Sequence, residues 1–133
     1  MRNKILTKKA TQESLVRLTR QQIIEAISNN NNSASGLNFS GKNLSELNLD
    51  GLNLSGAAFN DAKLVNTTLM NCDLRGCHFR KANLSGARFW YSHLENADLQ
   101  NADMQTTDLL DANLHKTFFE FKSLGGEILQ ERE

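Results

Sequence analysis

The 133-residue sequence lacks proline, contains only two cysteines and has few aromatic residues, at 7%. Cys72 and Cys77 are too few for a disulfide scaffold, so we expect a reducing, cytoplasmic setting. Fifteen basic side chains balance fifteen acidic ones, which gives no electrostatic reason to expect nucleic acid or an anionic membrane as a partner. These absences exclude several classes of protein but leave the fold open.

Long apolar runs are also absent. No stretch approaches the roughly 20 apolar residues that cross a bilayer, so we expect no membrane span. The basic start, residues 1–10, contains an apolar stretch too short for a cleaved signal peptide. A chain of this length predicts one domain with tails.

What the sequence has instead is a repeat of five residues. Every fifth residue from Phe39 is Phe, Leu or Met, eighteen times in succession. The residue two places earlier is mostly small, the one between them is most often Asn or Asp, and the next two are mostly polar or glycine. The large positions are Phe39, Leu44, Leu49, Leu54, Phe59, Leu64, Leu69, Leu74, Phe79, Leu84, Phe89, Leu94, Leu99, Met104, Leu109, Leu114, Phe119 and Leu124.

A strict period of five fits neither an amphipathic helix nor a plain strand. The small and large residues lie two apart, as on one face of a short strand, so a bend in the next three residues must restore the phase. A chain that bends equally every five residues coils, and stacked coils pair their backbones about 4.8 Å apart. The turn slot at the end of the pentad is often glycine: Gly41, Gly51, Gly56, Gly76 and Gly86.

Three pentads carry a family resemblance. Ala82–Gly86 reads ANLSG, Ala97–Asn101 reads ADLQN and Ala112–Lys116 reads ANLHK. They resemble the pentapeptide-repeat proteins, whose consensus is Ala-(Asp/Asn)-Leu-x-x. The resemblance implies an all-β solenoid: a right-handed quadrilateral β-helix, with four pentads and about 20 residues in each coil and about four coils in the stack.

The resemblance covers residues 37–121 and sets the domain boundaries that we expect. Residues 1–36 form a flexible N-terminus, a capping helix over about 12–28 and an Asn/Ser linker, and residues 122–133 form a C-terminal cap or tail. Residues 20 apart then share an inner column. The expected core columns are Phe39, Phe59, Phe79, Leu99 and Phe119, and Leu54, Leu74, Leu94 and Leu114.

Both ends of such a stack need covers, because they expose unpaired backbone. Upstream, Thr19 and Gln22 match a capping box, which predicts a helix from about Gln12 or Arg20 to Ser28 over the first coil. The connector after it, residues 29–36, has no content that would form a core.

Downstream, Phe118 and Phe121 stand where the pentad pattern expects polar residues. They either close the last coil as a plug, together with Ile128 and Leu129, or form a homodimer contact, which the family often uses.

No motif for chemistry accompanies the repeat. The spacings of cysteines and histidines fit no zinc site, and neither a phosphate loop nor a nucleophile motif is present. Cys72 and Cys77 fall at inward small positions, where a thiol replaces Ala, and the carboxylates lie along faces exposed to water. We therefore expect no catalytic residue, no metal and no cofactor.

One outward column stands out as a candidate interaction site. Stacking by 20 places Asp50, Met70, Trp90 and Leu110 together, with Tyr91 and Arg88 at its flanks. A flat apolar strip with a polar rim is typical of an interface. The alternative is that Met70 and Trp90 only pack against each other across coils.

The expected function is a non-enzymatic protein–protein interaction module, a rigid flat-sided scaffold. A helix, an Asn/Ser linker and coils also look like modules of bacterial secretion systems and secreted effectors, in which residues 1–11 would be the export signal. Members of the resembled family that protect DNA gyrase mimic DNA with a long acidic rod. Residues 37–124 carry ten acidic and eight basic side chains, which disfavours such a topoisomerase regulator. A purely structural homodimer is a third alternative.

Overall fold

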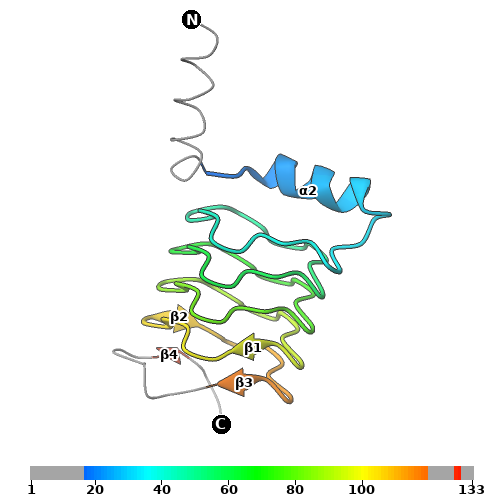
Figure 1. Cartoon of the computed structure of the whole chain (residues 1–133). Helices are drawn as coiled ribbons and strands as arrows, with labels where there is room; N and C mark the ends of the chain where they lie inside the picture. The colour runs from blue at the N-terminus through cyan, green and yellow to red at the C-terminus, as the bar shows by residue number, and fades with distance from the viewer. Residues whose placement is uncertain (1–16, 120–127, 130–133) are drawn as a thin grey trace, which may run out of the picture.

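The computed structural model describes residues 17–119 and 128–129. Its elements in chain order are helix α2 (Arg20–Asn29) and four two-residue strands. The strands are β1 (Asp98–Leu99), β2 (Thr107–Asp108), β3 (Phe118–Phe119) and β4 (Ile128–Leu129). Most of the chain between α2 and β1 winds in stacked coils beneath the helix (Figure 1).

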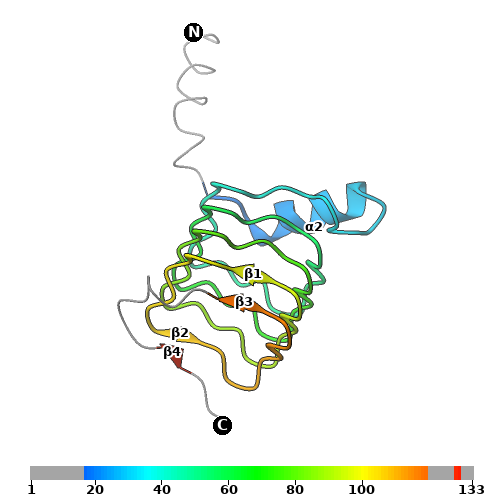
Figure 2. The same cartoon turned by 60° about the horizontal axis from the view of Figure 1, so that its bottom comes forward.

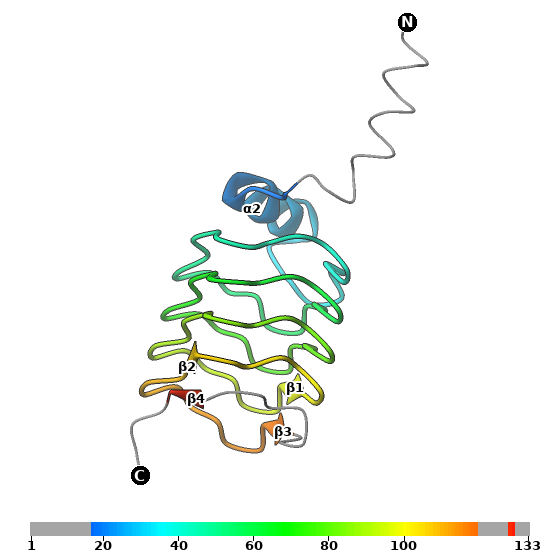
Figure 3. The same ribbon diagram turned by 90° about the vertical axis from the view of Figure 1, so that its left-hand side faces the viewer.

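Each coil takes 20 residues. Asn38 lies beside Ala58, Ala58 beside His78 and His78 beside Asp98, all in parallel register. The same step then pairs β1 with β3, where Asp98 lies beside Phe118. Backbone bonds of 2.6–3.3 Å join successive coils. The coils lie stacked one above another along a common axis (Figure 3). The coil length expected from the four-pentad register is therefore seen directly.

The corners are tight turns with one residue in the left-handed region. In one of them the amide of Lys42 donates to the carbonyl oxygen of Phe39 at 3.1 Å, and Gly41 has φ +73°. Positive φ at the third turn residue alone defines a type II turn. The fifth slot of the pentad keeps this conformation even without glycine, as at Tyr91 (φ 61°) and Thr106 (φ 56°).

The preference for Asn or Asp just before the large residue follows from the same corner. The side-chain oxygen at this position accepts a bond from the backbone amide two residues on, as Asn43 does from Ser45 and Asp98 from Gln100, both at 3.1 Å. This contact fixes the entry to the turn. Asn and Asp therefore recur at this position because their short side chains accept this bond, and the charge of Asp is not required.

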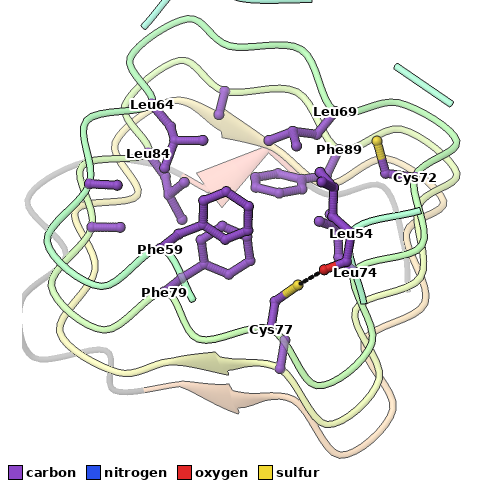
Figure 4. Packing of buried hydrophobic residues seen from close by; sticks show 14 of the residues in the cluster. Leu54, Phe59, Leu64, Leu69, Cys72, Leu74, Cys77, Phe79, Leu84 and Phe89 are labelled. Atoms are coloured by element: carbon purple, nitrogen blue, oxygen red, sulfur yellow. Dashed lines mark hydrogen bonds between the residues drawn. The ribbon is translucent and has the colours of Figure 1, made fainter. Parts of the chain in front are cut away.

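The large residues fill the interior of the coils. Phe39, Phe59 and Phe79 stack with ring centroids 5.4 and 5.0 Å apart. Phe89 meets Phe79 edge-on at 6.2 Å, and Figure 4 shows Phe59, Phe79 and Phe89 together in the interior. Leu99 is buried beneath them. Three members of the leucine column are buried: Leu54, Leu74 and Leu94. Near the lower end Leu114 and Phe119 are only partly buried.

Small inward side chains tie one coil to another. Thr67 and Cys72 donate to the carbonyl oxygens of Leu44 and Leu49, at 2.7 and 3.0 Å. Cys77 does the same to Leu54 at 3.0 Å (Figure 4). The donor lies 23 residues after the acceptor in each case, so a hydroxyl or thiol here adds a bond that alanine lacks.

Helix α2 begins with the predicted capping box. Thr19 accepts from the amide of Gln22 at 3.1 Å, and the side chain of Gln22 accepts from the amide of Thr19 at 2.8 Å. Ile23 is fully buried, and Leu47 and Leu52, which stand where small residues are usual, pack against the same core. These larger side chains occupy the end of the stack that α2 faces.

The helix has the later of its two predicted starts, at Arg20. Arg17 is extended instead and bridges Asn43, and the amide of Leu18 donates to the carbonyl oxygen of Asn43 at 3.2 Å. The predicted helical content of 12–16 lies outside the described residues. Because residues 17–19 precede the helix and Arg17 pairs with the first coil, the prediction of one helix over 12–28 is wrong at these three residues.

The connector was wrongly expected to add nothing to the core. Ala34 is buried at the large position one pentad before Phe39, and Gly36, with φ +81°, occupies the turn slot. The amide of Gly36 donates to Gly56 at 3.3 Å, and the Asn30 side chain donates to the carbonyl oxygen of Ser33 at 2.8 Å. The repeat therefore begins one pentad earlier than predicted.

At the lower end the ladder shifts by one residue. Strand β3 follows the 20-residue step below β1, but β4 pairs with β2 through Thr107 and Ile128, 21 positions apart (Figure 2). Phe118 in β3 is 55% exposed. Phe121, the other predicted cap residue, lies outside the described residues.

The corner at Thr106 gives a test of the turn geometry. A β-branched residue with positive φ costs about 1–2 kcal/mol, against about 0.5–1 kcal/mol for the extra flexibility of glycine. We expect Thr106→Gly to raise the free energy of unfolding by about 0.5–1 kcal/mol, measured by urea denaturation. Gln105→Gly, at the neighbouring turn residue without positive φ, should lower it. Equal losses in both variants would contradict the argument.

Candidate interaction surface

The backbone ladder aligns the predicted column, but along a corner of the coil stack and not on a flat face as expected. Trp90 and Tyr91 are the central residues of a turn in which the amide of Ser92 donates to the carbonyl oxygen of Phe89 at 3.0 Å, and Tyr91 has φ 61°. The amide of Gly51 donates to Met70 at 2.9 Å, that of Asn71 to Trp90 at 2.9 Å, and that of Tyr91 to Leu110 at 3.1 Å. Each bond crosses one coil, so Met70, Trp90 and Leu110 follow one another along the axis. We call Met70, Trp90 and Leu110, with the flanking Arg88 and Tyr91, the Trp90 strip.

The side chains of the strip differ in exposure. Met70, Trp90 and Leu110 are partly buried, whereas Arg88 is exposed and Tyr91 is 53% exposed. The Arg88 guanidinium carbon lies 5.9 Å from the centre of the Trp90 ring, a cation–π distance. The strip therefore offers apolar side chains at its centre and two large amphipathic ones at its sides.

Trp90 also holds an unsatisfied donor. Its Nε1 is buried and has no hydrogen-bond acceptor in the described part of the chain. A buried indole N–H usually finds a partner, and leaving one unpaired costs about 1–3 kcal/mol. Packing between coils accounts for the ring but gives no reason for this loss.

Polar contacts limit the strip at both ends. Above it, Arg20 of α2 donates to the carbonyl oxygens of Asn48 and Asp50 at 3.0 and 3.1 Å, and Asp50 accepts from the amide of Met70 at 2.8 Å. Below it, β2 pairs with β4. Asp50 is thus the polar end of the column rather than part of its apolar surface. The sequence did not reveal the Arg20 contact, because it joins residues 28 and 30 positions apart.

Arg88 differs from the other arginines of the coils. Arg80 pairs with Asp98 at 2.7 Å and Arg75 with Asp73 at 2.5 Å. Arg88 has no such pair with any carboxylate of residues 17–119. An unpaired guanidinium beside an apolar strip can bind a carboxylate from a partner without first losing one of its own.

Two hollows lie away from the strip. One, of about 350 Å³, is lined by Ile24, Ile27 and Leu52 between α2 and the first coil. The other, of about 430 Å³, is an open trough along a corner where Gly56 and Gly76 follow each other. Sequence reasoning missed the first, because it depends on where α2 lies. Neither brings together groups for catalysis.

The titratable groups of residues 17–119 lie apart from one another or in simple ion pairs. Among the described residues no group of three potential metal ligands occurs. The hydrogen bond from Arg75 lowers the pKa of Asp73, which makes this carboxylate a weaker base, whereas a general acid needs a raised pKa. His78, His93 and His115 are exposed at separate positions.

Comparison with known proteins identifies the repeat. The profile of pentapeptide repeats matches in eight copies, over residues 33–64, 53–90 and 91–120. The solved structure of Rfr23, a pentapeptide repeat protein from the cyanobacterium Cyanothece 51142, is similar at 29% identity and a TM-score of 0.64, over 68% of this chain and 60% of that one. This chain thus spans less than two thirds of the length of Rfr23.

Other similarities are weaker. The pentapeptide repeat protein alr5209 from Nostoc Pcc 7120 has 24% identity and a TM-score of 0.44, over 86% of this chain and 88% of that one. QnrB1, a plasmid-mediated fluoroquinolone resistance protein, has 16% identity and a TM-score of 0.25, over 65% and 63% of the two chains. Functionally curated proteins give no sequence match. No helix within the described residues is long and apolar enough to cross a membrane.

The buried thiols provide a test of the interior. Burial raises the pKa of Cys72 to about 11 and that of Cys77 to about 12, so the reactive thiolate is scarce at pH 8. We expect both thiols to resist a disulfide reagent in the native protein and to react at once in denaturant.

The raised pKa values of both thiols also make the free energy of unfolding depend on pH. The thiols of the unfolded chain ionise near pH 9, whereas those of the folded chain stay protonated to about pH 11. The stability that they contribute is therefore complete below pH 9 and is lost as the pH rises above it. Fast reaction of either thiol with the disulfide reagent in the native protein would contradict the burial from which both predictions follow.

Proposed function

This chain belongs to the pentapeptide-repeat family, and we propose that it is a non-enzymatic protein–protein interaction module that binds its partner through the Trp90 strip. The proteins of this family are right-handed quadrilateral β-helices, which confirms the expected fold class. The proposal includes about four coils in the stack and a capping role for α2, supported by the fully buried Ile23 and by Leu47 and Leu52 at the end that faces α2.

The observation that supports the proposal most is the composition of the surface along this one corner. Tryptophan, tyrosine, arginine and methionine are the residues enriched where proteins meet, and Trp90, Tyr91, Arg88 and Met70 stand together here. The only tryptophan and the only tyrosine of the chain are adjacent in this strip.

The absence of catalysis is part of the proposal. The thiols of Cys72 and Cys77 are buried and donate to backbone carbonyls, so they are poor nucleophiles. The hollow at α2, which is lined in part by apolar side chains, has no acid–base pair at its walls. The support is thus for binding by shape and side-chain contacts.

Regulation of a topoisomerase by DNA mimicry receives less support. A mimic needs a face of unpaired acidic groups, but Asp73 and Asp98 each pair with an arginine. The similarity to QnrB1 is too distant to argue a function. The proposed setting is the cytoplasm, with a role in a bacterial secretion system or as a secreted effector as the more specific alternative.

The test of the main proposal replaces Trp90. We expect Trp90→Asp to keep the far-ultraviolet β signature and to abolish capture of the partner in an affinity pull-down, because a carboxylate in the strip opposes apolar contact. Ser85→Asp is the matched control, since Ser85 holds the equivalent position one face earlier in the same coil. Equal capture by wild type and Trp90→Asp would contradict the proposal. Loss of the β signature would show that the ring is structural.

A homodimer through the C-terminal end is a second candidate, because Phe118 is 55% exposed on β3 at the lower end of the stack. If it is the contact, light scattering should give twice the 14.9 kDa chain mass for the wild type. Phe118→Ala should give one chain mass, and Trp90→Asp should still give two. A single-chain mass for the wild type would contradict this candidate.

A further inference from the structure

The spacing of the strip limits what can lie on it. Met70, Trp90 and Leu110 follow one another at one coil each, and successive coils are about 4.8 Å apart. The side chains on one face of an α-helix recur at each turn, about 5.4 Å along its axis. The two steps nearly match over three coils, so a helix parallel to the stack can place one apolar residue against each member of the strip.

We propose that the partner binds as an amphipathic α-helix laid along the Trp90 strip, parallel to the axis of the coils, with an acidic residue beside Arg88. This inference rests on the proposed function and adds the kind of partner to it. The apolar residues of that helix would stand at positions i, i+3 or i+4, and i+7, the pattern by which helices dock in apolar grooves.

The backbone of the face excludes the alternative of an added strand. The amide of Phe89 already donates to Asp108 at 2.8 Å, and that of Arg88 donates to Thr67 at 3.0 Å. These bonds run along the axis, as do those from Asn71 to Trp90 and from Tyr91 to Leu110, so the strip and the face beside it offer no free ladder to an extended peptide. Such a peptide would leave its own amides unpaired against apolar side chains, whereas a helix satisfies them internally.

The size of the strip also favours a single helix. Arg20 and Asp50 end it above, and the pairing of β2 with β4 ends it below. Three coils correspond to about two helical turns. The strip is a single column of side chains, with Arg88 and Tyr91 at its flanks. One docked element fits it, whereas a broad globular surface does not.

The charges beside the strip determine on which side the partner helix carries its acidic residue. Arg88 lies on one flank without an ion pair among residues 17–119, while the other flank carries Tyr91 and the exposed Asp111. Asp108, next to Arg88 in the ladder, accepts from the amide of Leu110 at 3.1 Å. A helix with Asp or Glu on the Arg88 side therefore gains a charge-assisted bond.

The experiment is an unbiased peptide selection on the full-length protein. A display library of random peptides of about 15 residues is enriched on wild type and depleted on Trp90→Asp, with Ser85→Asp retained as the control target. Selected peptides without tryptophan are then synthesised. Because Trp90 is the only tryptophan in the chain, its emission reports binding directly, and circular dichroism reports whether the peptide becomes helical.

We expect apolar residues at helical spacing with an acidic flank, a blue shift of the Trp90 emission and a gain of helix on binding. Arg88→Glu should weaken these peptides about tenfold and favour versions with Lys in place of the acid. Unchanged affinity in Arg88→Glu would overturn the assignment of the charged flank.

The remaining outcomes separate the two proposals. Peptides that depend on Trp90 but bind in an extended or proline-rich form would overturn the helix and leave the interaction face standing. A selection without any peptide that depends on Trp90 would overturn both.

Discussion

A left-handed backbone conformation at every fifth residue is the constraint on which the rest of the structure depends. It turns the chain through the same corner each time, so that the large residue of each pentad returns to the interior and residues 20 apart come into register. The ladder between coils, the column of phenylalanine rings and the flat faces all follow from this return. Glycine meets the constraint without strain, but Tyr91 and Thr106 show that the ladder also holds bulky residues there.

Much of this architecture could be predicted because it is periodic. The spacing of Phe39, Phe59 and Phe79 predicted that their rings form one stack. The capping box of Thr19 and Gln22 is a local motif, and it predicted the helix. The start of the repeat was misplaced by one pentad, since Ala34 is small where the pattern has a large residue. The sequence did contain evidence for this earlier pentad, because Gly36 stands five residues before Gly41 in the turn slot.

The candidate site was only partly predictable. Alignment of Met70, Trp90 and Leu110 needed nothing beyond the 20-residue register. The contact of Arg20 with Asp50, the ring distance of Arg88 and the unpaired Nε1 depend on side-chain conformations and on the position of α2, which no local pattern specifies. The sequence therefore indicated which residues form the Trp90 strip, and the structure showed where the strip ends and that Arg88 has no ion pair among residues 17–119.

The alternation of inward and outward side chains within each pentad has a consequence for how such chains diversify. Thr67, Leu69 and their equivalents serve the interior, while Thr68 and Met70 between and beside them contact only the surroundings and neighbouring coils. Mutation can rewrite an outer column while the frame beneath it stays unaltered. Two proteins built on one frame can thus recognise unrelated molecules, and overall likeness between them is a poor guide to shared biology.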